Sequence, residues 1–167
     1  KDKIIYIKIN NEPIDLCNNK EQIKNSIYKR LNSIKRIEQS YDYMMKGILD
    51  AQDEDLIMIS DNDEIPNLNS SQFKNSNKNF IIFKQLLFYY KFNLFHELMP
   101  WFGSKACKKK NLKSFSHLKN LKNKKYPFWR LDTYTSDIKE TNLDIIDEGG
   151  WHFTNIKTPD DLYIKMK

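Results

Sequence analysis

The chain has 167 residues, of which 40% are hydrophobic and 13% aromatic, and this length and composition suit a single globular domain over residues 1–167. The formal net charge of +6 fits an anionic partner, but 22 acidic residues accompany 28 basic ones, so charge does not choose between nucleic acid, a membrane surface and a phosphorylated small molecule. The two cysteines, Cys17 and Cys107, match neither a metal-binding pair nor a disulfide framework, and the longest apolar stretch, residues 80–95, is interrupted by charges, so we expect a cytoplasmic chain without a membrane span.

The first third of the chain is predicted to contain a strand, a long helix and a second strand. Residues 3–9 are rich in β-branched and aromatic side chains, which predicts a strand. Residues 20–51 place apolar side chains every three or four positions, which predicts a helix, and its length suggests a break near Asn32–Ser33 or Ser40. Residues 56–60 form a short continuous apolar run, which is typical of a strand buried on both faces.

The remaining two thirds are predicted to alternate between strands and short helical or loop segments. We expect a loop or short helix over 67–76, one or two strands over 79–95, a strand over 101–107, a basic helix or loop over 108–125, and strand-like segments over 129–134 and 145–153. A last helix is expected after the N-cap residue Thr158, with Pro159 at its first position and acidic residues in its first turn. This order of elements predicts an α/β domain with a mixed central sheet flanked by helices.

Three carboxylates follow the apolar run, in the stretch ISDNDEIP (59–66). Ligands of open α/β sheets bind beyond the carboxyl ends of the strands, which is where Asp61 and Asp63 are expected. Side chains at positions i and i+2 of an extended loop reach one ligand, so this pair suits Mg²⁺ or Mn²⁺, hard cations that take carboxylate oxygens and keep positions open for phosphate. The alternative is a polar turn whose aspartates cap the next segment.

A second polar stretch, DEGGWHF (147–153), places two acidic residues and two glycines before Trp151 and His152. The adjacent glycines permit close backbone approach or unusual dihedral angles. His152 is expected either to ligate a metal or contact a phosphate, or to be a satisfied core histidine in a bulged strand. The aromatic side chains expected either to stack on a base or sugar ring or to fill the core are Tyr89, Tyr90, Trp101 and Phe102.

Together and in this order, these stretches resemble glycosyltransferase family 17, which includes the eukaryotic enzyme that adds the bisecting N-acetylglucosamine to the core β-mannose of N-glycans. The matching stretches are GILDAQDEDLIMISDNDEIP (47–66), LFYYKFN (87–93), PWFGS (100–104), and DEGGWHF followed by DLYIKM (147–166). The resemblance covers about residues 36 to 166, most of the chain. The two most specific stretches are ISDNDEIP and GGWHF at this separation.

The resemblance implies a GT-A fold and the transfer of a sugar from a nucleotide-sugar donor with inversion at the anomeric carbon. It implies that Asp61 and Asp63 hold Mn²⁺ or Mg²⁺ on the donor diphosphate, and we expect His152 as a third contact to the metal or phosphate. Inverting transfer also needs a base that deprotonates the acceptor hydroxyl. The candidates for this base, in order, are Glu148, Asp147 and Glu64.

The donor implied by the resemblance is a UDP-sugar, with UDP-N-acetylglucosamine as the default, and the acceptor is a glycan or a lipid-linked saccharide. The residues expected to contact the donor are Tyr41, Asp42, Arg130, Trp151 and Lys165. Two departures from the family pattern bear on donor binding. Family members usually carry a strand and a helix before the position of Lys1, so we expect part of the nucleotide pocket to lie outside residues 1–167, and Ser40 and Tyr41 stand where arginine is expected.

A nucleic-acid-binding module is the main alternative from another class, supported by the net charge and the lysine-rich residues 105–125. These lysines lack the interleaved aromatics of a nucleic-acid reader, so no nucleic acid is expected. The same stretch is suited to peripheral contact with an anionic membrane surface, where lipid-linked acceptors reside. Two further alternatives are a metal-dependent phosphohydrolase and a degenerate transferase domain that binds sugar without turnover.

Overall fold

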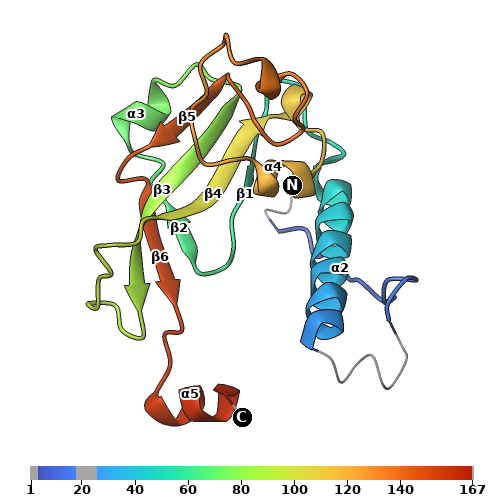
Figure 1. Cartoon of the computed structure of the whole chain (residues 1–167), viewed down its shortest axis with the longest axis vertical. Coiled ribbons are helices and arrows are strands. Elements are labelled where there is room, and N and C mark those ends of the chain that lie inside the picture. The colour runs from blue at the N-terminus through green and yellow to red at the C-terminus, as the bar shows by residue number, and fades with distance from the viewer. Residues whose placement is uncertain (1–3, 18–25, 167) are drawn as a thin grey trace.

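The computed structural model describes residues 4–17 and 26–166 (Figure 1). The helices are α2 (Ser26–Met44), α3 (Ser71–Lys74), α4 (Phe115–Asn120) and α5 (Pro159–Met166), with the short 3-10 helices η1 (Met45–Ile48), η2 (Lys109–Asn111) and η3 (Leu131–Thr133). The strands are β1 (Leu56–Ile59), β2 (Glu64–Pro66), β3 (Phe80–Tyr89), β4 (Trp101–Lys108), β5 (Leu143–Ile146) and β6 (Gly150–Thr154). The predicted α/β class is confirmed.

The strands form one curled mixed sheet in the order β1-β4-β3-β6-β2, with β5 also paired to β3 (Figure 1). Strand β4 is antiparallel to β1 and β3, whereas β5 and β6 are parallel to β3 and β2 returns antiparallel to β6. The long strand β3 has two parallel partners along its length. Its first half pairs with β5, and its second half, from Leu86 to Tyr89, pairs with β6. Strands β1, β3, β5 and β6 therefore run in the same direction.

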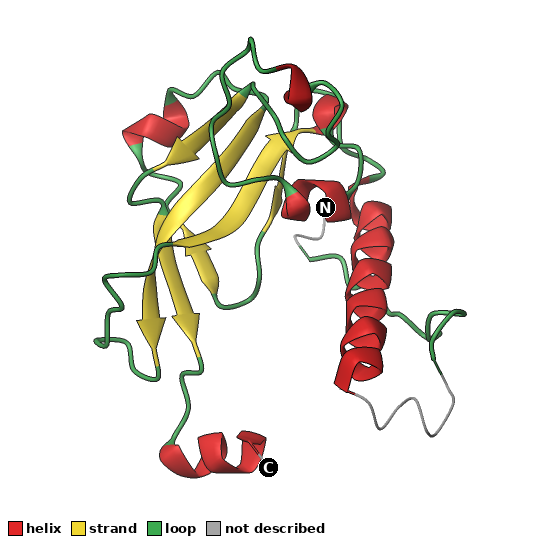
Figure 2. Cartoon of the chain, in the orientation of Figure 1, coloured by secondary structure: helices red, strands yellow, loops and turns green. Residues whose placement is uncertain are grey.

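Helices cover both faces of this sheet (Figure 2). On one face, α4 and the end of α2 pack against side chains from β1, β3 and β4. The buried members of this core are Ile57, Ile59, Phe80, Ile82, Cys107, Phe115, Leu118, Leu121 and Leu143. On the other face, α3 places Phe73 against a smaller core that includes Phe83 and Ile146. Because side chains alternate between faces along a strand, the neighbours Ile82 and Phe83 serve different cores.

The predicted strand over residues 3–9 is wrong for the residues that the structure describes. Residues 4–9 join no strand, and the side chains of Ile4 and Tyr6 are 85% and 86% exposed. Strand propensity is realised only where a neighbouring strand supplies hydrogen bonds and side-chain contacts. Ile7 instead packs close to Gly47 on η1. A Cβ atom added to this glycine would lie 3.1 Å from Ile7 Cδ1.

The predicted break in the long helix is also wrong, because α2 runs without interruption from Ser26 to Met44; residues 20–25 of the predicted helix lie outside the described residues. The side chain of Asn32 is buried, where it accepts a hydrogen bond from the Cys17 N–H and donates one to the Cys17 carbonyl, both at 3.0 Å. The Ser40 hydroxyl donates to the Ile37 carbonyl at 2.6 Å. These bonds satisfy polar side chains that otherwise favour helix ends.

Two further predictions about strands are corrected. Strand β1 is not fully buried on both faces, because Ile57 and Ile59 are buried on one face whereas on the other Met58 is half-buried and Leu56 is exposed. Residues 129–134 contain η3 rather than a strand, and the Thr133 hydroxyl closes this turn by donating to the Arg130 carbonyl at 2.7 Å. An apolar or aromatic run alone does not show whether a segment forms a strand or how fully that strand is buried.

The C-terminal helix is confirmed as α5, and its predicted cap is formed because Thr158 Oγ1 accepts a hydrogen bond from the Asp161 N–H at 3.2 Å. The strand-like segment at 145–153 is confirmed in part, since the turn before Gly150 divides it between β5 and β6. The predicted strand at 101–107 and the short helix within 67–76 are confirmed as β4 and α3, and the strand predicted at 79–95 is confirmed in part as β3, which ends at Tyr89 where a turn follows. The basic stretch at 108–125 contains both η2 and α4.

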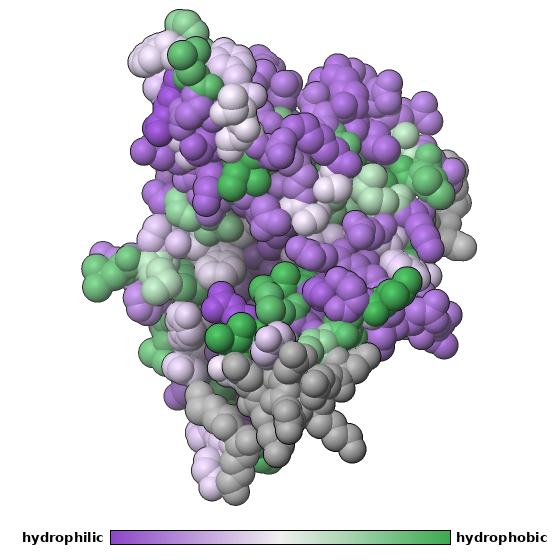
Figure 3. All heavy atoms as spheres, turned by 45° about the vertical axis from the view of Figure 1, so that its right-hand side comes forward, coloured by the Kyte–Doolittle hydropathy of each residue, from purple (hydrophilic) through white to green (hydrophobic). Residues whose placement is uncertain are grey.

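The face that includes α2 is largely hydrophilic, with separate apolar patches (Figure 3). Four large apolar side chains are exposed along α2 at helical spacing, namely Ile27, Leu31, Ile34 and Ile37. Among the helices that the structure describes, none is both long enough and apolar enough to cross a membrane.

Candidate functional site

Residues 61–63, here called the acidic loop, connect the carboxyl end of β1 to β2. Two backbone hydrogen bonds hold this loop. The Glu64 N–H donates to the Asp61 carbonyl at 3.1 Å, which closes a tight turn, and the Phe153 N–H on β6 donates to the Asp63 carbonyl at 2.9 Å. The acidic loop is therefore tied to a strand that follows it by about ninety positions in the chain, and its placement at the end of β1 agrees with the prediction.

Glu64, the third carboxylate of this stretch, has a side chain that is 0% exposed. Its two oxygens accept hydrogen bonds from the Asp61 N–H at 3.1 Å, from Trp101 Nε1 at 2.9 Å and from the Ser104 hydroxyl at 3.3 Å. Gly103 makes this close approach possible, because a Cβ there would lie 2.8 Å from the Glu64 carboxyl carbon. Glu64 is thus a buried support for the acidic loop, enclosed by hydrogen-bond donors.

Lys119, near the end of α4, places its ammonium group beside the same carboxylates. Its Nζ lies 2.9 Å from Asp61 Oδ2 and 3.5 Å from Glu64 Oε1. Burial acts to lower the pKa of Lys119, but the hydrogen bond to Asp61 and the charge of Glu64 outweigh it and raise this pKa above its usual value. Lys119 is therefore charged, and it neutralises part of the acidic loop.

A second lysine, Lys105 on β4, holds the end of α4 in place. Its buried Nζ donates to the carbonyls of Lys119 and Leu121, both at 2.7 Å. Burial, with a contribution from the charge of Lys119, lowers the pKa of Lys105 to about 8. The position of the Lys119 backbone therefore depends on a buried side chain from the sheet.

His152 on β6 lies directly opposite Glu64 on β2. Its buried ring stacks on Trp101 with the ring centres 4.3 Å apart and the planes 9° apart. His152 Nδ1 has no hydrogen-bond partner within the described part of the chain and lies 3.7 Å from Asp63 Oδ1, whose side chain is 40% exposed. An unpaired buried nitrogen beside a half-exposed carboxylate suits a divalent cation, so Asp63 and His152 fit the predicted metal.

The third predicted ligand is turned elsewhere, because the Asp61 carboxylate faces Lys119. Within the described ranges, 4–17 and 26–166, no group of three or more His, Cys, Asp or Glu side chains is already arranged to hold a metal ion. The residues brought together are therefore a pair, Asp63 and His152, with Asp61 adjacent and engaged by an internal cation.

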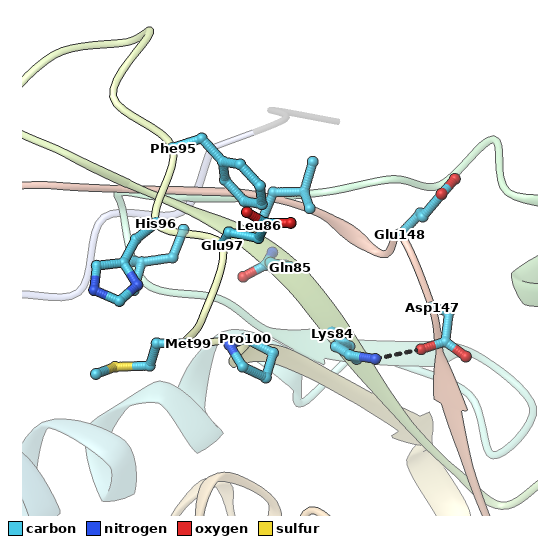
Figure 4. A pocket seen from close by; sticks show the side chains of 11 residues that line it. Lys84, Gln85, Leu86, Phe95, His96, Glu97, Met99, Pro100, Asp147 and Glu148 are labelled. Atoms are coloured by element: carbon cyan, nitrogen blue, oxygen red, sulfur yellow. Dashed lines mark hydrogen bonds and ion pairs between the residues drawn. The ribbon is translucent and has the colours of Figure 1, made fainter.

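Asp147 and Glu148, the first two candidates for the base, lie in the turn between β5 and β6 and line a pocket of about 330 Å³ (Figure 4). Lys84 Nζ pairs with Asp147 Oδ1 at 2.9 Å, while Glu148 sits in the left-handed region with φ of 49°. Lys84 and Gln85 project to opposite faces of β3, and the Gln85 amide donates to Ser104 in the network around Glu64 at 3.3 Å. Gln85 therefore links the lining of this pocket to the hydrogen-bond network around Glu64.

The five residues expected to contact the donor lie in different places. Tyr41 and Lys119 line a pocket of about 290 Å³ between α2 and α4, and burial raises the pKa of Tyr41 while the charges of Lys119 and Asp61 also act on it. Tyr41 is therefore close to the acidic loop. The other four residues lie elsewhere. Asp42 is exposed on α2, and Trp151 is on the opposite face of β6 from His152. Arg130 pairs with Asp132 at 2.6 Å, and Lys165 donates a hydrogen bond to Asn155 at 2.6 Å.

Lys119, Lys105 and Ser104 belong to this site but are not indicated by any pattern in the sequence. Both lysines belong to the basic stretch at 105–125, in which nothing distinguishes them from their exposed neighbours. The ion pair of Lys119 joins residues 58 positions apart, so only the packing of α4 on the sheet reveals it.

Comparisons with known proteins add no assignment to this geometry, since no family model, curated protein or solved structure matches the chain.

Proposed function

We propose that this chain is a GT-A type glycosyltransferase domain that moves a sugar from a nucleotide-sugar donor to a glycan acceptor with inversion, in a metal-dependent reaction. The observation that carries this proposal is the approach of Asp63 Oδ1 to within 3.7 Å of His152 Nδ1, a buried nitrogen without a hydrogen-bond partner among the described residues, at the carboxyl end of β1. In α/β sheets this is the edge where ligands bind. The resemblance of the same stretches to family 17 supports the proposal.

Asp63 and His152 would hold the Mn²⁺ or Mg²⁺ ion. When bound, such an ion neutralises the charge that develops on a departing diphosphate. The protein's own contribution is to keep the acidic loop in one conformation, because Glu64 accepts the Asp61 N–H and β6 binds the Asp63 carbonyl. The stacked ring of Trp101 fixes the plane of the His152 imidazole.

Glu148 is our candidate for the base that deprotonates the acceptor hydroxyl. Among the three carboxylates considered, Glu64 is enclosed by its hydrogen-bond donors and Asp147 is paired with Lys84. Glu148 is exposed and borders the pocket in Figure 4. A carboxylate in this setting accepts a proton from a hydroxyl held in that pocket.

The donor in this proposal is a UDP-sugar, by default UDP-N-acetylglucosamine, and the pocket shared by Tyr41 and Lys119 is the part of the described surface that adjoins the acidic loop. The acceptor is a glycan or a lipid-linked saccharide. The basic stretch at 105–125 is expected to approach an anionic membrane only in the second case.

The first test is isothermal titration calorimetry of UDP, UDP-N-acetylglucosamine and GDP, each with and without Mn²⁺. We expect Mn²⁺-dependent binding of the uridine nucleotides. Asp63→Asn should raise the Kd for Mn²⁺ by at least about tenfold, because even residues that only support metal ligands have effects of that size. His152→Phe, which keeps a ring against Trp101, should do the same, and Asp50→Asn, an exposed substitution of the same kind, should do nothing.

Turnover provides the second test. Glu148→Gln should lower kcat by about 10²- to 10⁴-fold, the usual contribution of a general base, and leave UDP binding unchanged. Unchanged turnover in this variant would remove Glu148 as the base. Nucleotide binding without turnover would favour the degenerate sugar-binding domain, and salt-sensitive binding of single-stranded DNA or RNA in place of nucleotide would favour the nucleic-acid-binding module.

A further inference from the structure

The ammonium group of Lys119 already occupies a cation position at the acidic loop. Its Nζ lies between two carboxylates, 2.9 Å from Asp61 and 3.5 Å from Glu64. The Glu64 side chain is fully enclosed, and the Lys119 side chain is only 19% exposed. This is a partly buried three-group ion cluster, and surface ion pairs of long flexible side chains do not have this form.

The fold holds Lys119 at this position from both sides. Its neighbour Leu118 is completely buried in the core under α4. Its own carbonyl accepts a hydrogen bond from the buried ammonium of Lys105. The backbone of Lys119 is therefore fixed, while its ammonium group is at the end of a flexible four-carbon stem.

A divalent cation on Asp61 would lie a few ångström from the Lys119 ammonium, and two positive charges at that separation repel each other strongly outside bulk water, so the cation competes with Lys119 for Asp61. We propose that Lys119 is a tethered counter-cation. In the metal-free protein it neutralises Asp61 and Glu64. When Asp61 joins Asp63 and His152 around a divalent cation, Lys119 leaves Asp61 and pairs with a phosphate of the nucleotide. This inference rests on the proposed metal-dependent function and adds to it a residue that couples the two ligands.

The inference predicts opposite effects of one substitution on two ligands. Lys119→Gln removes the competitor at Asp61, so Mn²⁺ should bind about two- to fivefold more tightly, the range expected for losing a partly exposed ion pair. The same substitution removes a charged hydrogen-bond donor to phosphate, so UDP should bind about tenfold or more weakly at saturating Mn²⁺. A lysine with only a structural role would not separate the two affinities in this way.

The experiment measures Mn²⁺ binding from the electron paramagnetic resonance signal of free Mn²⁺, and UDP binding by calorimetry at saturating Mn²⁺. Lys119→Met, which keeps the stem against its neighbours, should repeat the Lys119→Gln result if that variant folds poorly. Lys119→Arg should restore UDP binding toward that of the parent protein. Lys122→Gln, an exposed substitution with the same change in net charge, is the matched control and should change neither affinity.

The outcomes separate this inference from the function on which it rests. If the parent protein binds Mn²⁺ and UDP and both Lys119→Gln and Lys119→Met bind them equally well, the tethered counter-cation is wrong and the proposed function stands. If these variants bind both ligands more weakly, Lys119 is structural and the inference is overturned. If neither the parent protein nor any variant binds Mn²⁺, both the metal-dependent function and the inference fail.

Discussion

The two acidic stretches of this chain have similar composition and opposite surroundings. In the first, Glu64 is enclosed by donors from the acidic loop, from Trp101 and from Ser104. In the second, Glu148 is exposed in a turn with left-handed backbone. The first carboxylate stabilises structure and the second remains available to a ligand. The type of residue alone therefore does not tell an enclosed carboxylate from an exposed one, whereas the hydrogen-bond partners of the side chain do.

The largest difference between the two stretches is expected when each carboxylate is removed in turn. Glu64→Ala leaves Lys119, Trp101 and Ser104 without their buried partner, so the free energy of unfolding should fall by about 3 kcal/mol. The matched variant Glu148→Ala should change it by less than about 0.5 kcal/mol, as expected for a surface substitution. Urea unfolding monitored by circular dichroism measures both. Equal losses in the two variants would contradict the assignment of Glu64 as the support.

The second prediction concerns Gly150, which pairs with Pro66 where β6 meets β2. Gly150 begins β6 with φ of +125°, and a Cβ there would lie 2.0 Å from the Ile65 carbonyl oxygen on β2. Gly150→Ala should therefore cost about 1–3 kcal/mol of unfolding free energy, through strain and a disturbed β2–β6 contact. Gly47→Ala is the control, because its Cβ would meet only the tip of the flexible Ile7 side chain at 3.1 Å. A stable Gly150→Ala protein would mean that β2 moves away from β6 readily.

The third prediction concerns the buried Lys105 and the dependence of the free energy of unfolding on pH. Burial lowers the pKa of Lys105 from its usual 10.5 to about 8, so between these values the unfolded chain binds more protons than the folded one. The free energy of unfolding of the parent protein should therefore rise, relative to that of Lys105→Met, as the pH increases from about 8 to 10.5. Thermal unfolding of the two proteins over this range measures the difference. A constant difference would show that Lys105 keeps its ordinary pKa.

The smallest effect on stability is expected from the exposed ion pair beside Glu148. Lys84 and Asp147 form an ion pair at 2.9 Å in which the side chains are 42% and 68% exposed. Solvent and salt screen such pairs, so Lys84→Gln should lower the free energy of unfolding by less than about 1 kcal/mol, and by less still in 0.5 M salt. Urea titrations at low and high salt provide this measurement. A loss as large as that of Glu64→Ala would show that the second stretch is also a structural support.

Local patterns in the sequence predicted the elements whose determinants are adjacent in the chain. The Thr158–Pro159 pair specified the start of α5, and the apolar run from Leu56 to Ile59 specified a strand followed by the acidic loop. These predictions succeeded because the cap, the turn and the strand propensity act within a few residues.

Contacts between distant residues were not predictable in the same way. The β-branched run at 4–9 has the composition of a strand but lacks a pairing partner among the described residues. The ion pair between Lys119 and Asp61, and the stack of Trp101 on His152, arise only when β4, β6 and α4 are packed together. The sequence indicated which acidic residues lie at the end of β1, but it did not indicate which of them is already neutralised.

The two cysteines offer a practical consequence of the same contrast between buried and accessible side chains. Cys107 is buried in the core, and burial raises the pKa of its thiol to about 11, so it should resist alkylation at pH 8. Cys17 is partly exposed, and its backbone is bound to the side chain of Asn32 on α2. Any labelling of the native protein by a maleimide dye should therefore occur at Cys17 rather than at Cys107, and the fluorescence of the dye would report when Cys17 detaches from α2.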